Sequence, residues 1–150
     1  MIYGKTPIKF NTNKKYRHLL SNDFELDLRQ RFKQESRFKE FVSLTKEGIL
    51  FISMGYAWDG VSAPLIDIDS CRNLRASIVH DALYQLMRND QEFETRENKK
   101  IADRIFRELC IQDGVKKSTA WIYWAAVSFL GKPGTQPGGR FPNGQSPCKK

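Results

Sequence analysis

The sequence lacks any apolar run long enough to cross a bilayer, which takes about 20 residues. Its longest apolar stretch extends only from Ala120 to Leu130. The first ten residues, MIYGKTPIKF, contain no apolar segment after their charges, so we expect no secretory signal peptide. Cysteine is scarce, with three residues and no C-x-x-C pair, which is typical of a reduced compartment. These features exclude a disulfide-stabilised scaffold and a membrane-spanning helix.

Acidic residues are absent from both ends of the chain, although the formal net charge is +8. Residues 1–20 and 131–150 contain only basic charges, whereas the part between them is close to neutral. A dedicated nucleic-acid-binding fold usually carries its charge on a folded face, so a nucleic-acid partner is not expected. Basic arms of this kind contact an acidic partner or an anionic surface, or serve as solubilising tails.

The length and the aromatic content predict one domain with its own core. The chain has 150 residues, of which 40% are hydrophobic, and it contains 10 Phe, 5 Tyr and 3 Trp. The last 20 residues hold five Gly and four Pro, which exclude a helix or a central strand. We therefore divide the chain into a basic N-terminal arm (1–20), a single α+β domain (21–131) and a flexible basic tail (132–150).

Strand signals come first along the chain. Phe24–Leu28 alternates apolar and polar side chains, which favours a half-buried strand. Phe41–Leu44 and Ile49–Met54 flank the turn Thr45–Gly48 and predict a β-hairpin. The segment Gly55–Pro64, GYAWDGVSAP, is bounded by turn residues and is expected to be a structured loop.

Three helices are expected after this loop. The first covers about 70–87 with Asp69 or Ser70 as its N-cap, and the second covers about 96–110 with Thr95 as its N-cap. The third covers about 118–130, with Ser118 as its cap. The predicted fold class is α+β, with an N-terminal antiparallel sheet or hairpin packed on a C-terminal three-helix cluster.

The third helix is apolar nearly all round. Such a helix is buried between layers or contacts a partner or a membrane surface. We therefore expect Trp121 and Trp124 to lie in the core or at an interface.

His80 and Asp103 are the strongest candidates for chemistry. They lie about 12 and 10.5 Å from the loop that joins the first two helices, so in an antiparallel pair they stand at the same height. A carboxylate on the facing helix fixes the tautomer of a histidine and raises its basicity, which a general base needs. The alternative is a core histidine that Asp103 satisfies, with Asp81 and Tyr84 as structural hydrogen-bonding groups.

Asp81 points about 100° away from His80 on the same helix. It could therefore face the loop 55–64 and bind a cation with the loop carbonyls and Asp59. Oxygen ligands alone favour calcium or magnesium over zinc. No cofactor is certain from the sequence, and calcium is the candidate.

Two resemblances rest on the same motifs. GYAWDGVSAP, VHDALY and IADRIF, followed by a Trp-rich helix, resemble the signature of domain-of-unknown-function family 1353, over about residues 40–132. That resemblance implies a phage or prophage origin and no settled activity. HDALY followed by a helix with an inward Asp is similar to the catalytic helix pair of secreted phospholipases A2. Carried over, it implies that His80 is the general base and Asp81 a calcium ligand, with Tyr84 a supporting hydroxyl and Asp103 orienting His80.

The sequence leaves two compatible functions open. The first is a virion-associated protein of a tail, neck or host-entry assembly, made in the bacterial cytoplasm, whose arms order against other phage structural proteins. The second is a cation-assisted hydrolase that acts on lipid or another cell-envelope component. In the first case, four residues of the tail are expected to contact the neighbouring subunit: Arg140, Phe141, Lys149 and Lys150.

Overall fold

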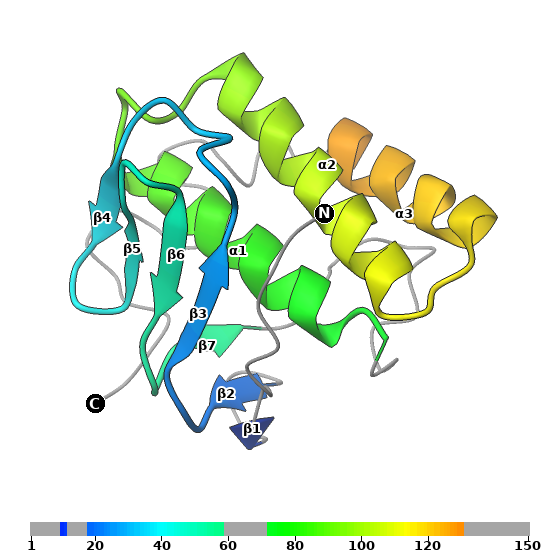
Figure 1. The fold of residues 1–150 in the computed structure, drawn as a ribbon, viewed down its shortest axis with the longest axis horizontal. Coiled ribbons are helices and arrows are strands. Elements are labelled where there is room, and N and C mark those ends of the chain that lie inside the picture. Colours follow the sequence, from blue (N-terminus) through cyan, green and yellow to red (C-terminus); the bar gives the residue numbers. More distant parts are fainter. Residues whose placement is uncertain (1–9, 12–17, 59–71, 131–150) are drawn as a thin grey trace.

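The structure, a computed structural model, describes residues 10–11, 18–58 and 72–130. Two small antiparallel sheets precede three helices, so the α+β class is confirmed (Figure 1). One sheet has the order β3-β6-β5-β4 and the other has the order β1-β2-β7. The strands are β1 (Phe10–Asn11), β2 (His18–Leu20), β3 (Phe24–Asp27), β4 (Ser36–Phe38), β5 (Val42–Leu44), β6 (Ile49–Ile52) and β7 (Ala57–Trp58).

The predicted hairpin is confirmed as β5 and β6. Thr45 N–H donates to Ile49 O at 3.0 Å, and Gly48 N–H donates to Thr45 O at 3.0 Å, which closes the turn. Phe24 and Leu26 of β3 are buried while Glu25 is exposed, as the alternation predicted. Strand β3 pairs with β6 from Phe24 opposite Ile52 to Asp27 opposite Ile49. The hairpin and β3 therefore present one apolar face.

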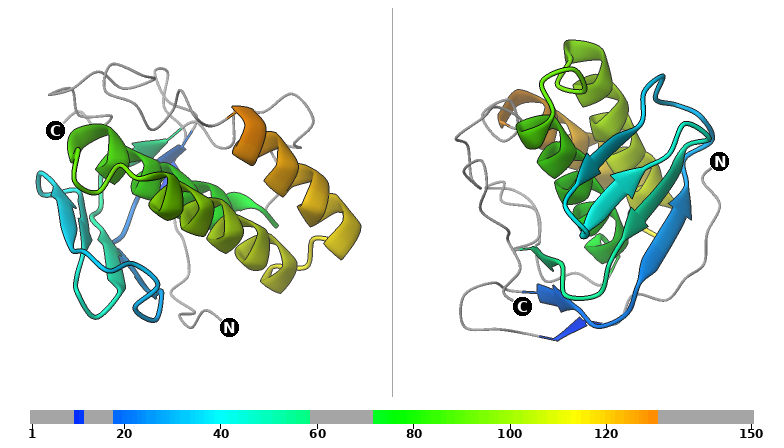
Figure 2. Two further views of the ribbon diagram at one scale, coloured as in Figure 1. Left: turned by 90° about the horizontal axis from the view of Figure 1, so that it is seen from above. Right: turned by 90° about the vertical axis from the view of Figure 1, so that its left-hand side faces the viewer.

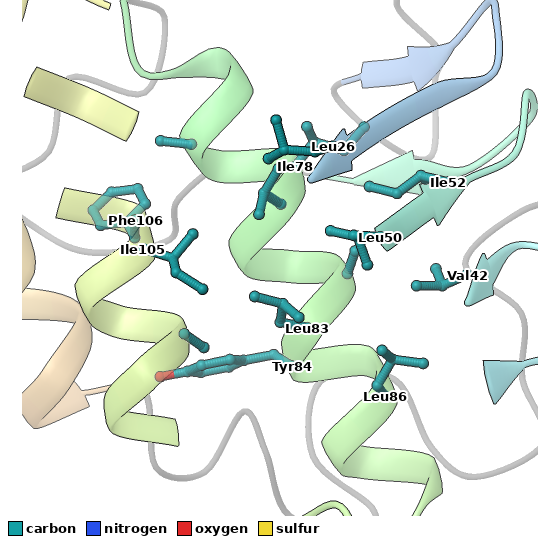
Figure 3. Packing of buried hydrophobic residues seen from close by; sticks show 14 of the residues in the cluster. Leu26, Val42, Leu50, Ile52, Ile78, Leu83, Tyr84, Leu86, Ile105 and Phe106 are labelled. Carbon is teal, nitrogen blue, oxygen red and sulfur yellow. The ribbon is translucent and has the colours of Figure 1, made fainter. Parts of the chain in front are cut away.

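The helices are α1 (Leu74–Asn89), α2 (Arg96–Gln112) and α3 (Lys117–Leu130). Helix α1 lies between the four-stranded sheet and α2, and α3 packs on the far side of α2 (Figure 2). Strand side chains such as Leu26 and Leu50 meet Ile78 and Leu86 of α1 (Figure 3). Ile105 and Phe106 of α2 enclose α1 from the other side (Figure 3).

The predicted boundaries need three corrections. Helix α1 begins at Leu74 and not at Ser70, and its N-cap Asn73 makes no side-chain cap bond. Helix α3 begins at Lys117, so Ser118 lies inside the helix rather than capping it. Strand β2 falls within the predicted N-terminal arm, but it pairs with β7 and buries Leu20, so this part of the arm belongs to the fold. The Thr95 cap of α2 is confirmed, since its hydroxyl accepts from Asn98 N–H at 3.0 Å.

Two glycines offer a matched test of the backbone. Gly48 and Gly114 both have a positive φ, at 90° and 94°, which costs an L-residue about 1–2 kcal/mol. A Cβ at Gly48 would overlap the backbone nitrogen of Gln30, whereas a Cβ at Gly114 would meet no atom within 4 Å. We expect Gly114→Ala to lower the free energy of unfolding by about 1–2 kcal/mol and Gly48→Ala by at least about 3 kcal/mol. Urea denaturation of both variants checks the order, and equal losses would contradict it.

Candidate functional site

Helix α1 is buried on nearly all sides, so its polar side chains need partners inside the protein. Every residue from Ala76 to Arg88 is buried, because the sheet covers one side of α1 and α2 covers the other. A buried polar group without a hydrogen bond is costly. The consecutive residues His80 and Asp81 therefore bond to different elements: His80 bonds to α2, and Asp81 bonds to the segment that precedes α1.

His80 faces α2, where Asp103 lies at the predicted height. The His80 Nε2 atom is 2.8 Å from Asp103 Oδ1, so the predicted hydrogen bond across the two helices is confirmed. The hydroxyl of Tyr84 donates to the same oxygen at 2.6 Å, and its ring reaches from α1 toward α2 (Figure 3). The His80 ring lies 4.0 Å from the Tyr84 ring and 5.3 Å from the Phe106 ring, centroid to centroid. These contacts fix the plane of the imidazole.

The second oxygen of Asp103 accepts a hydrogen bond from Lys99, which was not among the predicted site residues. Lys99 Nζ donates to Asp103 Oδ2 at 2.8 Å and to the carbonyl oxygen of Ser128 on α3 at 3.0 Å. The only signal in the sequence was the spacing of four residues between Lys99 and Asp103, which places both on one side of α2. Asp103 is therefore held by groups from α1 and α2, and through Lys99 it is linked to α3.

The protonation states of this cluster follow from its contacts. Burial alone would raise the pKa of Asp103, but the hydrogen bond and the charge of His80, with the bonds from Lys99 and Tyr84, lower that pKa to about 2. Burial, together with the charge and the hydrogen bond of Asp103, raises the pKa of Tyr84 far above its usual range. At neutral pH Asp103 is therefore a carboxylate, and the Tyr84 hydroxyl keeps its proton and donates.

A charged, acceptor-only Asp103 decides which nitrogen of His80 carries the proton. Because Oδ1 can only accept, Nε2 must donate, and the neutral ring then has its lone pair on Nδ1. The His80 side chain keeps 10% of its surface exposed. This is the proton arrangement of a histidine general base.

Asp81 faces the start of the motif that precedes α1. The hydroxyl of Tyr56 donates to Asp81 Oδ2 at 2.8 Å, and Trp58 Nε1 donates to Ser77 Oγ at 3.1 Å. The described part of this segment, Gly55–Trp58, therefore packs over α1 as predicted, but it is not all loop, because Ala57–Trp58 pairs with β2 as strand β7. Asp59 lies outside the described residues.

The described residues do not by themselves form a calcium site. Calcium takes six to eight oxygen ligands, and of the two carboxylates that the sequence predicts there, Asp81 and Asp59, Asp81 is the one within the described residues. Across 10–11, 18–58 and 72–130, no group of three or more His, Cys, Asp or Glu side chains is arranged to hold a metal ion.

Tyr56 offers a test of the buried carboxyl of Asp81. Tyr56→Phe removes the hydroxyl that donates to Asp81 Oδ2 and leaves this oxygen buried without that donor. We expect the free energy of unfolding to fall by about 1–3 kcal/mol. Tyr123→Phe is the matched control, because Tyr123 is also buried but its hydroxyl has no hydrogen bond to another described residue. Chemical denaturation should show a change within about 0.5 kcal/mol for the control, and equal losses would contradict the role of Tyr56.

The remaining predicted site residues divide into two groups. Trp121 and Trp124 lie on α3 with their rings 5.4 Å apart, and Trp121 is exposed while Trp124 is half-buried. The tail residues expected to contact a partner lie outside the described residues: Arg140, Phe141, Lys149 and Lys150.

Comparison with known families and proteins places the chain in one family. A family model described as "Protein of unknown function (DUF1353)" matches residues 37–127, and the chain belongs to this family. The match runs from β4 through the Tyr56–Trp58 segment and the His80–Asp103 pair into α3. No curated protein and no solved structure matches the chain.

Proposed function

We propose that this protein is a hydrolase in which His80 is the general base and Asp103 is the residue that orients it. The observation that carries the proposal is the 2.8 Å bond from His80 Nε2 to Asp103 Oδ1, an oxygen that Tyr84 also binds. Three donors hold the Asp103 carboxylate in one orientation, so it keeps the lone pair of His80 on Nδ1.

The proposed reaction is the hydrolysis of an ester in a lipid or another cell-envelope component. Nδ1 of His80 accepts a proton from a water molecule while the water oxygen forms a bond to the ester carbonyl carbon. The tetrahedral intermediate then breaks its bond to the alkoxide, and the imidazolium returns the proton to this leaving group. Asp103 stays charged throughout and stabilises the imidazolium.

The alternative is that His80 is a purely structural residue of the core. A core histidine also needs a partner for its N–H, so the bond to Asp103 is common to both interpretations. The 10% of the His80 side chain that stays exposed favours the catalytic one.

An assay of the whole chain tests the proposal. The purified protein is incubated with a short-chain p-nitrophenyl ester and with vesicles of phosphatidylglycerol and phosphatidylcholine, each with calcium or with EDTA. We expect release of a carboxylic acid from at least one ester, followed by absorbance or mass spectrometry. If neither the ester nor the lipids are hydrolysed in either condition, the proposed substrate class is wrong.

The expectation of a virion component stays a prediction. It rests on the basic arms and on the phage origin that the family resemblance implies. The tail that would contact other phage structural proteins lies outside the described residues.

A further inference from the structure

A groove of about 800 Å³ lies between α2 and α3. Basic side chains of α2 line one wall: Arg96, Lys99, Lys100 and Arg104. Trp124 and Phe129 of α3 line the other. Two carboxylates, Glu94 and Asp103, also line the groove. Asp103 is already bound by Lys99 and His80.

Three of the four cations are available for a ligand. Arg96, Lys100 and Arg104 are exposed, and they are four residues apart, so they form one row along α2. Among the described residues, they have no hydrogen-bonding or ion-pair partner. Guanidinium and ammonium groups in such a row match the spaced phosphates of an anionic surface.

Helix α3 leaves an apolar side uncovered beside this row. Ala120, Tyr123 and Val127 are buried toward the core, whereas three large apolar side chains are exposed: Trp121 by 57%, Ile122 by 50% and Phe129 by 84%. These three lie within an arc of about 100° of the helix. Phe129 belongs to both the groove and the exposed arc, so the basic and apolar surfaces are continuous.

The dimensions of α3 decide how it could meet a bilayer. Its 14 residues include no acidic one, and its length of about 21 Å is shorter than the hydrocarbon core of about 30 Å. Within the described residues, no helix is long and apolar enough to span a membrane. An apolar arc on a short helix, next to a row of cations, fits a helix that lies along the interface.

We propose that the exposed arc of α3 and the basic row of α2 form a docking surface for an anionic phospholipid membrane. Trp121, Ile122 and Phe129 enter the boundary between headgroups and acyl chains, where aromatic side chains are favoured. Arg96, Lys100 and Arg104 contact the lipid phosphates beside them. The proposal does not depend on hydrolysis, because binding is measured without turnover.

Co-sedimentation of the full chain with vesicles tests this surface. Vesicles of phosphatidylglycerol and phosphatidylcholine in equal parts should bind the protein, and vesicles of phosphatidylcholine alone should bind it at least tenfold more weakly. We expect the double variant Lys100→Glu with Arg104→Glu, and the double variant Trp121→Ala with Phe129→Ala, each to lower the partition coefficient more than tenfold. The four substituted side chains are all exposed, so the variants should fold, and circular dichroism checks this.

Matched controls separate this surface from overall charge and apolarity. Arg37→Glu with Lys46→Glu makes the same change in net charge at exposed residues of β4 and of the turn between β5 and β6, in the sheet that packs on α1. Met54→Ala removes an apolar side chain that is 61% exposed and that follows β6, outside α2 and α3. Both controls should bind within about threefold of the unchanged protein, since their sites lie on the sheet side of α1, whereas α2 and α3 carry the proposed surface.

Four results would overturn the proposal. The first is no binding to the anionic vesicles, and the second is equal binding to the neutral ones. The third is an equal loss in the control variants, which would mean that net charge alone drives binding. The fourth is complete displacement of the protein from vesicles by millimolar inorganic phosphate, which would assign the groove to small phosphates instead of a membrane.

Discussion

Asp103→Ala should strongly destabilise the helix pair, lowering the free energy of unfolding by about 3–5 kcal/mol. Asp103 is 2% exposed, and its removal leaves the Lys99 ammonium, the Tyr84 hydroxyl and the His80 N–H without their shared acceptor. Breaking a buried ion pair by removing one partner costs more than losing one neutral hydrogen bond. Urea denaturation measures the loss.

The pH dependence of stability, measured for the unchanged protein and for Asp103→Ala, gives an independent check. The pKa of Asp103 is lowered from 3.8 to about 2 in the fold. A lowered carboxyl pKa contributes stability that is present above the unfolded value and is lost as the pH falls through the folded value. We therefore expect about 2 kcal/mol of stability to disappear between about pH 4 and pH 2, and Asp103→Ala should lack this component.

An exposed carboxylate provides the control for both measurements. Glu25 of β3 is exposed, so Glu25→Ala should change stability by less than about 0.5 kcal/mol. If Asp103→Ala loses less than about 1 kcal/mol, the cluster is not the buried, coupled unit described above.

His80→Gln should abolish most of the proposed ester hydrolysis, with a fall in rate of about 10²–10⁴-fold. Glutamine can keep a hydrogen bond to Asp103, but it cannot accept a proton from water at neutral pH. The fold should survive, because the substituted side chain still has a partner in Asp103. Initial rates, with thermal unfolding measured alongside, separate a lost base from a lost fold.

The second histidine of the chain provides the matched control. His18 is also buried, lies against the Trp58 ring at 5.1 Å between centroids, and belongs to β2 rather than to the helix pair. His18→Gln should leave the rate within about threefold of the unchanged protein. If His80→Gln keeps full activity, His80 is a structural residue and the proposed mechanism is wrong.

Local patterns in the sequence were enough to predict the elements that carry the site. The turn at Gly48 and the flanking β-formers predicted the hairpin, and the Thr95 cap fixed the start of α2. The short loop between α1 and α2 set the heights of His80 and Asp103, because a helix rises by a constant amount per residue. That arithmetic was sufficient to predict their hydrogen bond.

Features that depend on tertiary packing could not be predicted in the same way. Every residue of α1 from Ala76 to Arg88 is buried, because the sheet and α2 cover opposite sides of the helix, and no local pattern shows in advance which elements will pack on it. Strand β2 was missed because its three residues pair with β7, a partner far along the chain. Lys99 was missed because a lysine four residues before an aspartate is usually a surface pair, and only the packing of α3 buries this one.

The proton positions on His80 are the most direct test of the account. Long-range ¹H–¹⁵N correlation spectra of the protein labelled at histidine nitrogen report which ring nitrogen carries the proton, and His18→Gln assigns the two rings. At a pH where the ring is neutral, we predict that Nε2 carries the proton and Nδ1 does not, and that Asp103→Ala loses this single tautomer. A proton on Nδ1 in the unchanged protein would contradict the account, because His80 would then have no free nitrogen with which to activate water.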